Sequence, residues 1–411
     1  MNKQHRQKKD ASYLNKLNKI EVLGLIRKLG ETSRADIVKK TKLSAPTVTR
    51  IVDSLISSNL VSMVGKGDST GGRPPKVIKF DGSHNYVIGI DLGATNIRAG
   101  LSDLEGLFIN EIQTSTDIYG GIDKICEQIG ELSEKLIIRS KIDKQEVLGI
   151  GLAVAGLINS ENGIVEYSPL FNWNKVDLRE ELSKHISFPI YYDNVSRVTA
   201  FGELLNGVGK KYQNFICVNV AYGIGAGIII GGKPFYGSQG FAGELGHVVV
   251  DQNSSYTGKD GIRGCLEALS SGYGIAEIAK YRISKDKNDK SALKGIENIT
   301  AKIVVDAAKA GDELAIEIFN DAMQHLGVAI DMLIKLFDPK VIVFSGGITK
   351  SGDIFFEKLS DAVRKNKLVA LESDNETKLL PSSFKEDAAL IGAISLIISR
   401  ILQFENDVHH T

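Results

Sequence analysis

Two glycine-rich turns, each next to an apolar run, constrain the fold of this chain more than any other feature. The first lies in residues 89–95 (GIDLGAT); the second, residues 223–227 (GIGAG), follows the apolar run 215–220 and comes about 130 residues later. Glycine lets backbone turn tightly and approach a ligand closely, although a single glycine turn often only closes a hairpin. The alternation of apolar runs with helical patterns from Tyr86 onward favours α/β layers. We therefore predict an α/β body with a duplicated fold that clamps a ligand between two lobes.

A third glycine pair extends this pattern. Gly346 and Gly347 follow the apolar run 341–344, directly after a long helical stretch from about residue 312 to 337. In nucleotide-binding proteins with this layering, such a position lets backbone approach a base or ribose. The three turns together supply the candidate phosphate-loop positions Asp91, Gly93, Thr95, Gly223, Gly225, Gly346 and Gly347.

The first 80 residues carry the pattern of a winged helix-turn-helix domain. Ser33 and Asp36 have capping-box spacing, which predicts a helix start, and Ser44 can cap a second helix. The apolar residues of that second helix recur with the helical period at Val48, Ile51, Val52, Leu55 and Ile56. Its opposite face is then free to enter the major groove of DNA, although such helix pairs also occur in proteins that never bind DNA. The predicted DNA contacts are Ser44, Thr47, Thr49 and Arg50.

A predicted wing follows this helix pair. Residues 60–64 and 77–80 have the pattern of short strands, and the loop between them contains GGRPP at 71–75. Because the glycines allow close approach and the prolines keep the tip extended, Arg73 is placed to enter a narrow, electronegative minor groove. The alternative is a flexible linker with incidental charge. We add Arg73 to the predicted DNA contacts.

Charge and length agree with a DNA-binding domain joined to a larger body. Residues 1–80 hold about 17 Lys and Arg against about 6 Asp and Glu, whereas the whole chain has a formal net charge of zero. A chain of 411 residues exceeds what one hydrophobic core normally supports. We expect a DNA-binding domain at 1–80 and a body at 81–411, with lobes at about 85–200 and 201–411.

The cysteines and the hydropathy of the N-terminus indicate the cellular compartment. The three cysteines are far apart and odd in number: Cys126, Cys217 and Cys265. The polar N-terminus holds no apolar run of signal-peptide or membrane length. We expect a cytoplasmic protein with no membrane partner.

Several strings occur in the order typical of one family: GGRP at 71–74, DLGAT at 91–95, GELGH at 243–247 and GIRGCLE at 261–267. From about Leu17 to Leu402 the chain resembles the ROK family of repressors and sugar kinases, in the winged-helix branch that includes xylose- and N-acetylglucosamine-responsive repressors. The resemblance implies a two-lobed, actin-like body of the sugar-kinase and Hsp70-type ATPase fold, with a sugar in the cleft. By the family pattern, the sugar-binding positions are Asn194, Glu244, His247 and Glu267, whose side chains can pair with hydroxyls.

The chain departs from the sugar kinases of this family at several positions. Phosphorylation needs a base that accepts the hydroxyl proton, and the kinases carry an Asp where this chain has Val195. Asp193 lies two residues earlier and could act as a displaced base if the segment is extended. In the glycine turns, Tyr222 replaces a phosphate-binding hydroxyl, Ala94 a glycine and Asn96 a lysine. We therefore expect no catalytic residue, vestigial phosphate loops and no bound ATP.

The zinc site that the resemblance implies is incomplete. The family commonly supplies one His and three Cys; here His247 and Cys265 match, whereas Gly258 and Asp260 occupy two of the Cys positions. Structural zinc prefers four ligands, and Gly258 offers no side chain. We expect a degenerate site at His247, Asp260 and Cys265 that holds no zinc and is kept in shape by packing or hydrogen bonds.

Two further departures concern the sugar pocket. Leu170 and Arg197 stand where sugar-contacting or neighbouring asparagines often occur in the family. Arg197 could recognise a carboxylate or phosphate, as in a uronate or a sugar phosphate, or it could form an ion pair with an acid such as Asp193. These two interpretations of Arg197 stay open at this point.

Together the patterns predict a sugar-responsive transcriptional regulator, and specifically a repressor of carbohydrate-utilisation genes. The expected partners are operator DNA, a sugar or sugar derivative, and further copies of the chain in a homodimer or higher oligomer. One alternative is an ATP-dependent, glucokinase-like sugar kinase with an accessory DNA-binding domain. Another is a regulator whose body responds to a protein partner.

Overall fold

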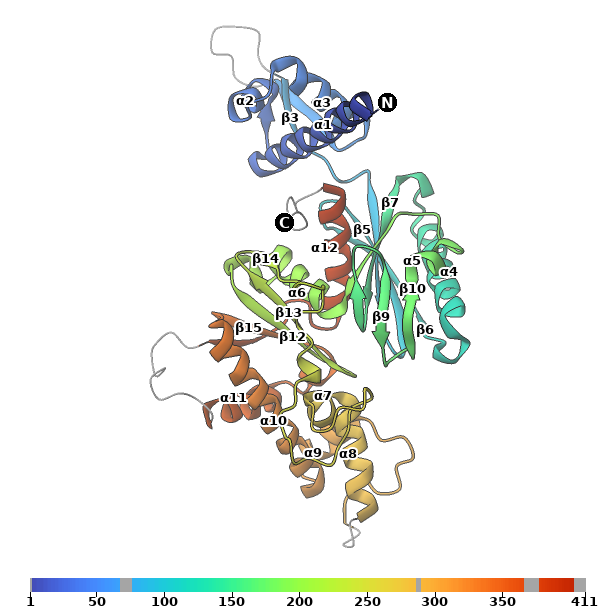
Figure 1. The fold of residues 1–411 in the computed structure, drawn as a ribbon, viewed down its shortest axis with the longest axis vertical. Helices are drawn as coiled ribbons and strands as arrows, with labels where there is room; N and C mark the ends of the chain where they lie inside the picture. Colours follow the sequence, from blue (N-terminus) through green and yellow to red (C-terminus); the bar gives the residue numbers. More distant parts are fainter. Residues whose placement is uncertain (1, 67–75, 286–289, 366–376, 403–411) are drawn as a thin grey trace.

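The computed structural model describes residues 2–66, 76–285, 290–365 and 377–402. Figure 1 shows three parts along the longest axis: a small N-terminal domain at the top, a first lobe below it and a second lobe at the bottom. Arg73, the predicted minor-groove contact, lies outside the described residues. The first lobe therefore stands between the N-terminal domain and the second lobe.

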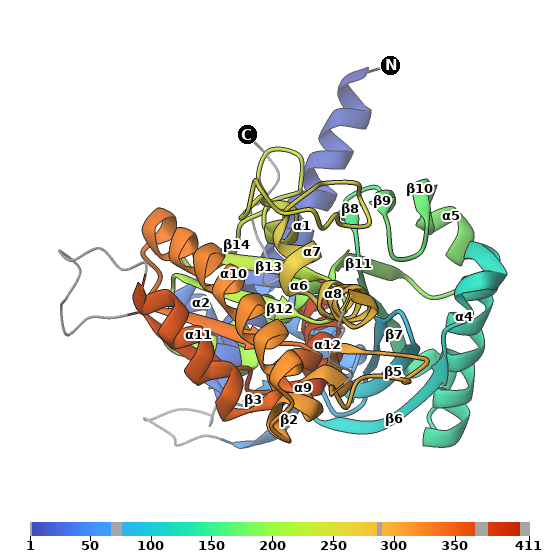
Figure 2. The same cartoon turned by 90° about the horizontal axis from the view of Figure 1, so that it is seen from below.

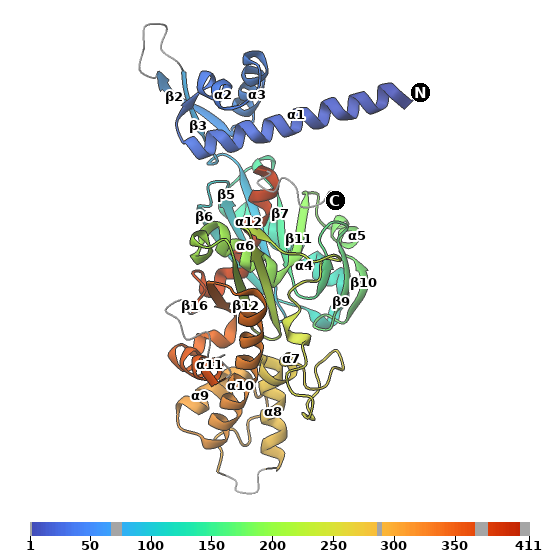
Figure 3. The ribbon, with the colours of Figure 1, turned by 60° about the vertical axis from the view of Figure 1, so that its left-hand side comes forward.

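The N-terminal domain combines three helices with a small sheet. Ser33 Oγ accepts a hydrogen bond from Asp36 N at 3.2 Å, and Ser44 Oγ accepts one from Thr47 N at 3.4 Å, which confirms both predicted helix starts. Figure 3 shows the long first helix projecting to one side of the domain. The strands pair in the order β1-β3-β2. The elements are α1 (Asn2–Leu29), β1 (Thr32–Ser33), α2 (Arg34–Lys40), α3 (Ala45–Ser57), β2 (Val61–Lys66) and β3 (Lys76–Phe80).

The first lobe is built on a five-stranded sheet in the order β11-β7-β4-β5-β6. Three of its strands, β4, β5 and β6, form an antiparallel meander, and β7 and β11 run parallel to β4. Their apolar side chains pack into one buried core cluster with those of the helix that follows β6. The strands are β4 (Tyr86–Leu92), β5 (Asn96–Asp103), β6 (Phe108–Ser115), β7 (Val147–Val154) and β11 (Ile190–Asn194).

The second lobe repeats this topology in the order β14-β13-β12-β15-β16. Again three strands form an antiparallel meander, and two strands run parallel to the first of them. The two predicted glycine turns join the first hairpin of each sheet, so the duplicated α/β fold is confirmed. The strands are β12 (Phe215–Val220), β13 (Ile224–Ile230), β14 (Lys233–Pro234), β15 (Val341–Ser345) and β16 (Lys378–Pro381).

Helices and a small third sheet complete the body. Figure 2, seen from below, shows α9, α10 and α11 gathered on the second lobe and α4 at the edge of the first. No helix within the described ranges has the length and apolarity needed to cross a membrane. The remaining elements are β8 (Leu157–Asn159), β9 (Ile164–Ser168), β10 (Trp173–Asp177), α4 (Gly121–Ser140), α5 (Leu178–Ser183), α6 (Val195–Asn206), α7 (Leu266–Ser270), α8 (Gly272–Lys285), α9 (Ala301–Lys309), α10 (Glu313–Phe337), α11 (Asp353–Lys365) and α12 (Ala388–Leu402).

Helices α6 and α12 cross in close contact and join the two lobes. Helix α6 packs on β12 and β13 of the second sheet, whereas α12 packs on β4 and β7 of the first. A Cβ on Gly392 of α12 would lie 2.2 Å from Val198 O of α6, so no larger residue fits at that point. The contacts place α12 beside the first sheet, whereas the division expected from sequence assigned residues 201–411 to the second lobe.

The N-terminal domain shares a hydrophobic core with α12. One cluster of buried side chains combines Val22 and Ile26 of α1, Val52 of α3, and Ile397 and Leu402 of α12. Burial of apolar surface is the main stabilising contribution in protein cores, so this cluster fixes the domain against the body. The N-terminal domain is therefore continuous with the first lobe in its packing.

Hydrogen bonds to the N-terminal domain and to the body hold the short connection between them. Asn85 Nδ2 donates hydrogen bonds to Ser58 O at 3.3 Å and to Asn59 O at 3.2 Å, both at the end of α3. On the body side, Gly82 N donates to Glu105 Oε1 at 3.2 Å. Residues 81–85 thus act as a fixed junction between the two parts.

Truncation of Leu402, an α12 residue in the shared core, tests this packing. Leu402 is 1% exposed, so Leu402→Ala should lower the free energy of unfolding by about 2–4 kcal/mol, because a buried leucine is lost and a cavity remains. Ile138→Ala on the exposed face of α4 is the control and should change stability by less than about 0.5 kcal/mol. Urea unfolding followed by circular dichroism measures both, and equal effects of the two variants would contradict the shared core.

Candidate functional site

A cavity of about 440 Å³ lies between the lobes, where the glycine turns of the two sheets meet. The N-terminal residues of α6 and α12 also line it. The structure brings together all the residues predicted for the phosphate loops and for sugar binding on the walls of this one cavity: Asp91, Gly93, Thr95, Gly223, Gly225, Gly346, Gly347, Asn194, Glu244, His247 and Glu267. The roles of these residues stay predictions.

Asn194 is held in one orientation at the N-terminus of α6. Its Oδ1 accepts hydrogen bonds from Ser196 N at 2.8 Å and Arg197 N at 3.4 Å, and so caps the helix. Its Nδ2 donates to Gly156 O at 3.0 Å, which ties α6 to the first lobe. The second hydrogen on Nδ2 stays available, so Asn194 can still donate to a ligand in the cavity.

Glu244 and Glu267 form an acidic pair next to His247. Glu267 Oε2 accepts a hydrogen bond from Ile224 N at 3.2 Å, and Glu244 Oε2 lies 3.6 Å from His247 Nε2. Burial raises the pKa of both carboxyls, and the nearby imidazole of His247 opposes this effect. Partly buried carboxylates with few partners are strong acceptors for the paired hydroxyls of a sugar.

Gly223 is required by this arrangement. A Cβ at residue 223 would lie 2.4 Å from Glu267 Oε2, so the second glycine turn and the acidic pair touch directly. Gly346 in the third turn has φ 99°, and a Cβ there would lie 2.4 Å from Val220 O. The turns are thus shaped for close backbone approach. In the first turn, burial raises the pKa of Asp91 to about 6, against the opposing effect of the Arg98 guanidinium.

The residues at the degenerate zinc position do not fit a zinc ion. His247 Nδ1 is hydrogen-bonded to Asp260 Oδ2, and Asp260 Oδ1 accepts from Ile262 N at 2.9 Å. A Cβ at Gly258 would lie 2.8 Å from the buried Cys265 Sγ, so a side chain at residue 258 would point toward the Cys265 thiol. In the ranges that the structure describes, no group of three His, Cys, Asp or Glu side chains could hold a metal. The His247–Asp260 hydrogen bond instead connects the loop to the cavity wall.

Arg197 does not face the ligand cavity. Its guanidinium is 2.6 Å from the Asp193 carboxylate, both side chains are 3% exposed, and Nη1 donates to Gly240 O at 2.7 Å. Asp193 Oδ1 also accepts from Ser160 Oγ at 2.7 Å. Of the two interpretations left open for Arg197, the ion pair is therefore correct. The same contacts occupy Asp193, which does not line the cavity as a displaced base would.

A cluster that sequence reasoning did not find lies at the second turn. Lys259 Nζ sits 4.5 Å from the ring centroid of Tyr222 and 5.0 Å from that of Tyr273. Tyr222 and Lys259 both line the cavity. The three residues come from separate segments, so no local pattern links them. Tyr222 thus brings an aromatic ring to the position where, by the family pattern, the sugar kinases carry a small phosphate-binding hydroxyl.

The predicted DNA contacts lie at the start of α3. Ser44 and Arg50 are exposed and Thr47 and Thr49 are half-buried. The Ser44 and Thr47 hydroxyls lie 2.9 Å apart, and Arg50 Nη2 donates to Asn15 Oδ1 of α1 at 2.8 Å. DNA contact by these residues stays a prediction, and a hydrogen bond from Arg50 Nη2 to a base would replace the one to Asn15.

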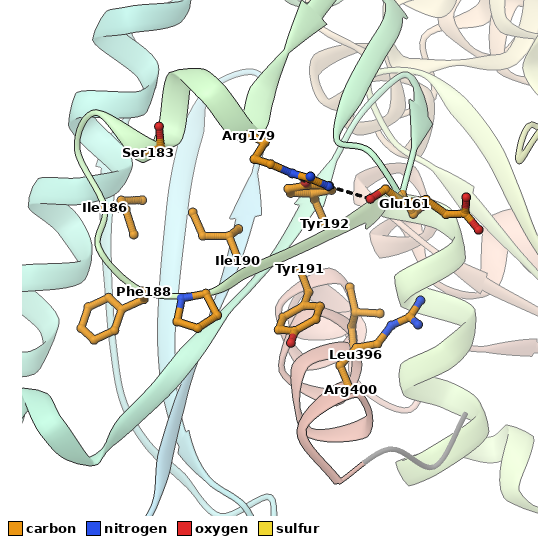
Figure 4. Close-up of a pocket in the computed structure, with 12 residues that line it drawn as sticks. Glu161, Arg179, Ser183, Ile186, Phe188, Ile190, Tyr191, Tyr192, Leu396 and Arg400 are labelled. Atoms are coloured by element: carbon orange, nitrogen blue, oxygen red, sulfur yellow. Dashed lines mark hydrogen bonds between the residues drawn. The ribbon is translucent and has the colours of Figure 1, made fainter. Parts of the chain in front are cut away.

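A second cavity, of about 450 Å³, lies at the edge strand β11 between α5 and α12 (Figure 4). Arg179 Nε donates to Tyr192 Oη at 2.9 Å, and Arg179 Nη2 donates to Glu161 O at 2.6 Å. These polar groups satisfy one another, and the other walls are largely apolar. No residue predicted for sugar or DNA binding lines this cavity.

The sequence profile of the ROK family matches residues 87–400. The chain belongs to the ROK family. A xylose repressor from Caldicellulosiruptor bescii is 30% identical over 392 residues, which cover 95% of this chain and 98% of that repressor. A glucokinase from Thermotoga maritima is 31% identical and covers 77% of this chain and 98% of the kinase.

A solved ROK family transcriptional regulator, described as a homologue of the E. coli MLC protein, has a TM-score of 0.77 and 27% identity to this chain. The match covers 95% of this chain and 96% of that structure. The repressor and the regulator thus match nearly the whole chain, whereas the glucokinase matches about the length of the body. The predicted fold, a winged helix followed by a two-lobed, actin-like ROK body, is confirmed.

The loop at the degenerate zinc position gives a direct test. Dialysis against EDTA and addition of zinc should each leave the melting temperature of the protein unchanged, because a hydrogen bond between His247 and Asp260 connects the loop to the cavity wall. Asp260→Ala should lower the free energy of unfolding by about 1–2 kcal/mol, since it removes the hydrogen-bond partner of Nδ1 in the partly buried His247. The exposed Asp306→Ala is the control, measured by thermal denaturation. A melting temperature that falls in EDTA would contradict this interpretation.

Proposed function

We propose that this ROK protein is a sugar-responsive transcriptional repressor of carbohydrate-utilisation genes. The observation that carries the proposal is the cavity between the lobes, which gathers Asn194, Glu244, His247 and Glu267 and is also lined by the start of α12, the helix that shares a core with the N-terminal domain. The nearly full-length matches to a xylose repressor and to a ROK transcriptional regulator support it. A neutral, hydroxyl-rich ligand fits carboxylate and amide groups of this kind.

The path from the cavity to the DNA-binding domain is short and made of packed elements. Ala388 and Ala389, at the start of α12, line the cavity, and Leu402, at its end, lies in the core shared with α1. Helix α6 also begins at the cavity, with Asn194 as its cap. A sugar that binds the open and closed lobes with different affinity would therefore change the position of α12 and of the DNA-binding domain.

On the DNA side, we propose that Thr47, Thr49 and Arg50 read bases in the major groove, with Ser44 at the start of the helix and Arg73 in the minor groove. Two copies of the chain would read a roughly palindromic operator, because protein symmetry and DNA symmetry then match. The homodimer and its operator are part of the proposal.

We further propose that the chain does not phosphorylate its sugar. Val195 cannot accept a proton, and Asp193 is engaged with Arg197 and Ser160. On the cavity wall, the second glycine turn carries Tyr222. The kinase pattern has a small hydroxyl side chain at this position, which could bind a phosphate. The rival function is a sugar kinase with an accessory DNA-binding domain, which the similarity to a glucokinase favours.

A gel-shift experiment tests the repressor function. Full-length protein should retard DNA from upstream of its own gene and of neighbouring sugar genes, and one compound from a panel of sugars and sugar phosphates should release it. Glu267→Gln should retain DNA binding but need at least roughly tenfold more sugar for release, because a charged acceptor for hydroxyls is lost.

The control for this variant is Glu277→Gln on the exposed surface of α8, which should behave as the wild type. Absence of specific DNA binding at any salt concentration would rule out the repressor. Specific DNA binding that no sugar or sugar phosphate changes, together with a protein that does release the DNA, would favour the regulator that responds to a protein partner.

A kinase assay separates the rival function. The purified wild-type protein should show no ATP-dependent phosphorylation above background over a panel of aldoses, because a positioned base usually contributes about 10² to 10⁴ in rate and is absent here. A ROK glucokinase in the same assay is the positive control. Clear turnover that disappears in Asn194→Ala would overturn the assignment and make this chain a kinase.

A further inference from the structure

The walls of the cavity between the lobes include more than the sugar-binding candidates. Besides Glu244, His247 and Glu267, they include Tyr222, Asn219 and Ser345. A volume of about 440 Å³ lies in the range of roughly 300–1,000 Å³ that is typical of small-molecule sites. The cavity therefore has space beside the acidic pair for more of a ligand.

The charges along the cavity disfavour an anion in that space. Four carboxylates line it, against three lysines: Asp91, Glu244, Glu267 and Glu386 against Lys259, Lys350 and Lys385. Lys350 is already paired with Glu386 at 2.6 Å. A triphosphate would thus meet carboxylates without a matching excess of cations. The charge distribution favours a neutral ligand.

Tyr222 presents an aromatic platform on the wall of the cavity. Its ring is tilted by 42° against that of Tyr273, with centroids 5.8 Å apart, and the Lys259 ammonium lies over both rings. These contacts fix the ring, yet Tyr222 keeps 42% of its surface exposed. A fixed tyrosine supplies a large contact area at low cost in conformational entropy.

The platform is adjacent to the acidic pair. Tyr222 precedes Gly223, whose missing side chain leaves room for Glu267 Oε2, and Ile224 N donates to that same oxygen. A sugar ring hydrogen-bonded to Glu267 would therefore lie next to the turn that carries Tyr222. The C–H face of a second sugar ring is apolar and packs well on an aromatic ring.

We propose that Tyr222, held by Lys259 and Tyr273, forms a second sugar subsite, so that the effector of this protein is a neutral disaccharide or glycoside and not a free monosaccharide. This inference rests on the proposed sugar-responsive function and names its ligand class. The first ring pairs with Asn194, Glu244, His247 and Glu267, and the second ring stacks on Tyr222. The aromatic side chain thus gives a binding role to a turn that lacks its phosphate-binding hydroxyl.

Isothermal titration of the full-length protein with matched sugar pairs tests the subsite. The pairs are xylose and xylobiose, glucose and cellobiose, and N-acetylglucosamine and its β-linked dimer. In the pair that binds, the disaccharide should bind at least roughly tenfold more tightly than the monosaccharide. Tyr222→Ala should abolish this gain and leave the Kd of the monosaccharide within roughly twofold, whereas Tyr222→Phe should retain the gain because the stacking face remains.

Tyr281→Ala, at an exposed tyrosine outside the cavity, is the matched control and should bind both sugars as the wild type does. Equal affinity for the two members of each pair, or a gain that survives Tyr222→Ala, would overturn the subsite. A monosaccharide that releases operator DNA without any preference for its dimer overturns the subsite and leaves the repressor function standing. Absence of binding by every sugar overturns the subsite and the sugar response, whereas the gel shift decides separately whether the chain is a DNA-binding regulator. An adenine nucleotide that loses affinity in Tyr222→Ala would assign the ring to a base instead.

Discussion

The rest of the structure depends on the close crossing of α6 and α12. Gly202 and Gly392 meet with only van der Waals space between the helices, and a Cβ on Gly392 would collide with Val198 O. Because α6 packs on the second sheet and α12 on the first, this crossing sets the angle between the lobes and hence the shape of the cavity. Packed helices have few alternative arrangements. A movement of the residues that line the cavity therefore cannot easily be accommodated by small local shifts of these two helices.

The polar cavity of the body is held in shape by a small number of side-chain contacts. An ion pair between Asp193 and Arg197 fixes the start of α6, and a hydrogen bond between His247 and Asp260 holds the loop beside the acidic pair. Tyr222, at the second glycine turn, and Lys259 lie in contact on the cavity wall. These groups support a polar cavity between the two lobes, in which we propose that a sugar is sensed.

Local features of this chain were predictable from sequence, whereas contacts between distant segments were not. The caps at Ser33 and Ser44 depend on residues three positions away, and the glycine turns follow their own strands. By contrast, the partner of Arg197 was one of two open interpretations, and the return of α12 to the first sheet joins segments that no spacing connects. The Lys259–Tyr222 contact also depends on tertiary packing alone. The sequence therefore shows a tyrosine at the position of the kinases' hydroxyl, but it does not predict the contacts that this tyrosine makes.

The shared core also bears on how separable the parts of this chain are. In sequence, the basic N-terminal segment has the appearance of an independent cassette attached to an acidic body. In three dimensions, a cut at residue 81 would expose Val22, Leu23 and Ile26 on one fragment and Ile397 and Leu402 on the other. Large exposed apolar patches promote association of fragments. A chimaeric regulator built from this chain would therefore need to exchange α12 together with the winged helix, because the two have one hydrophobic core in common.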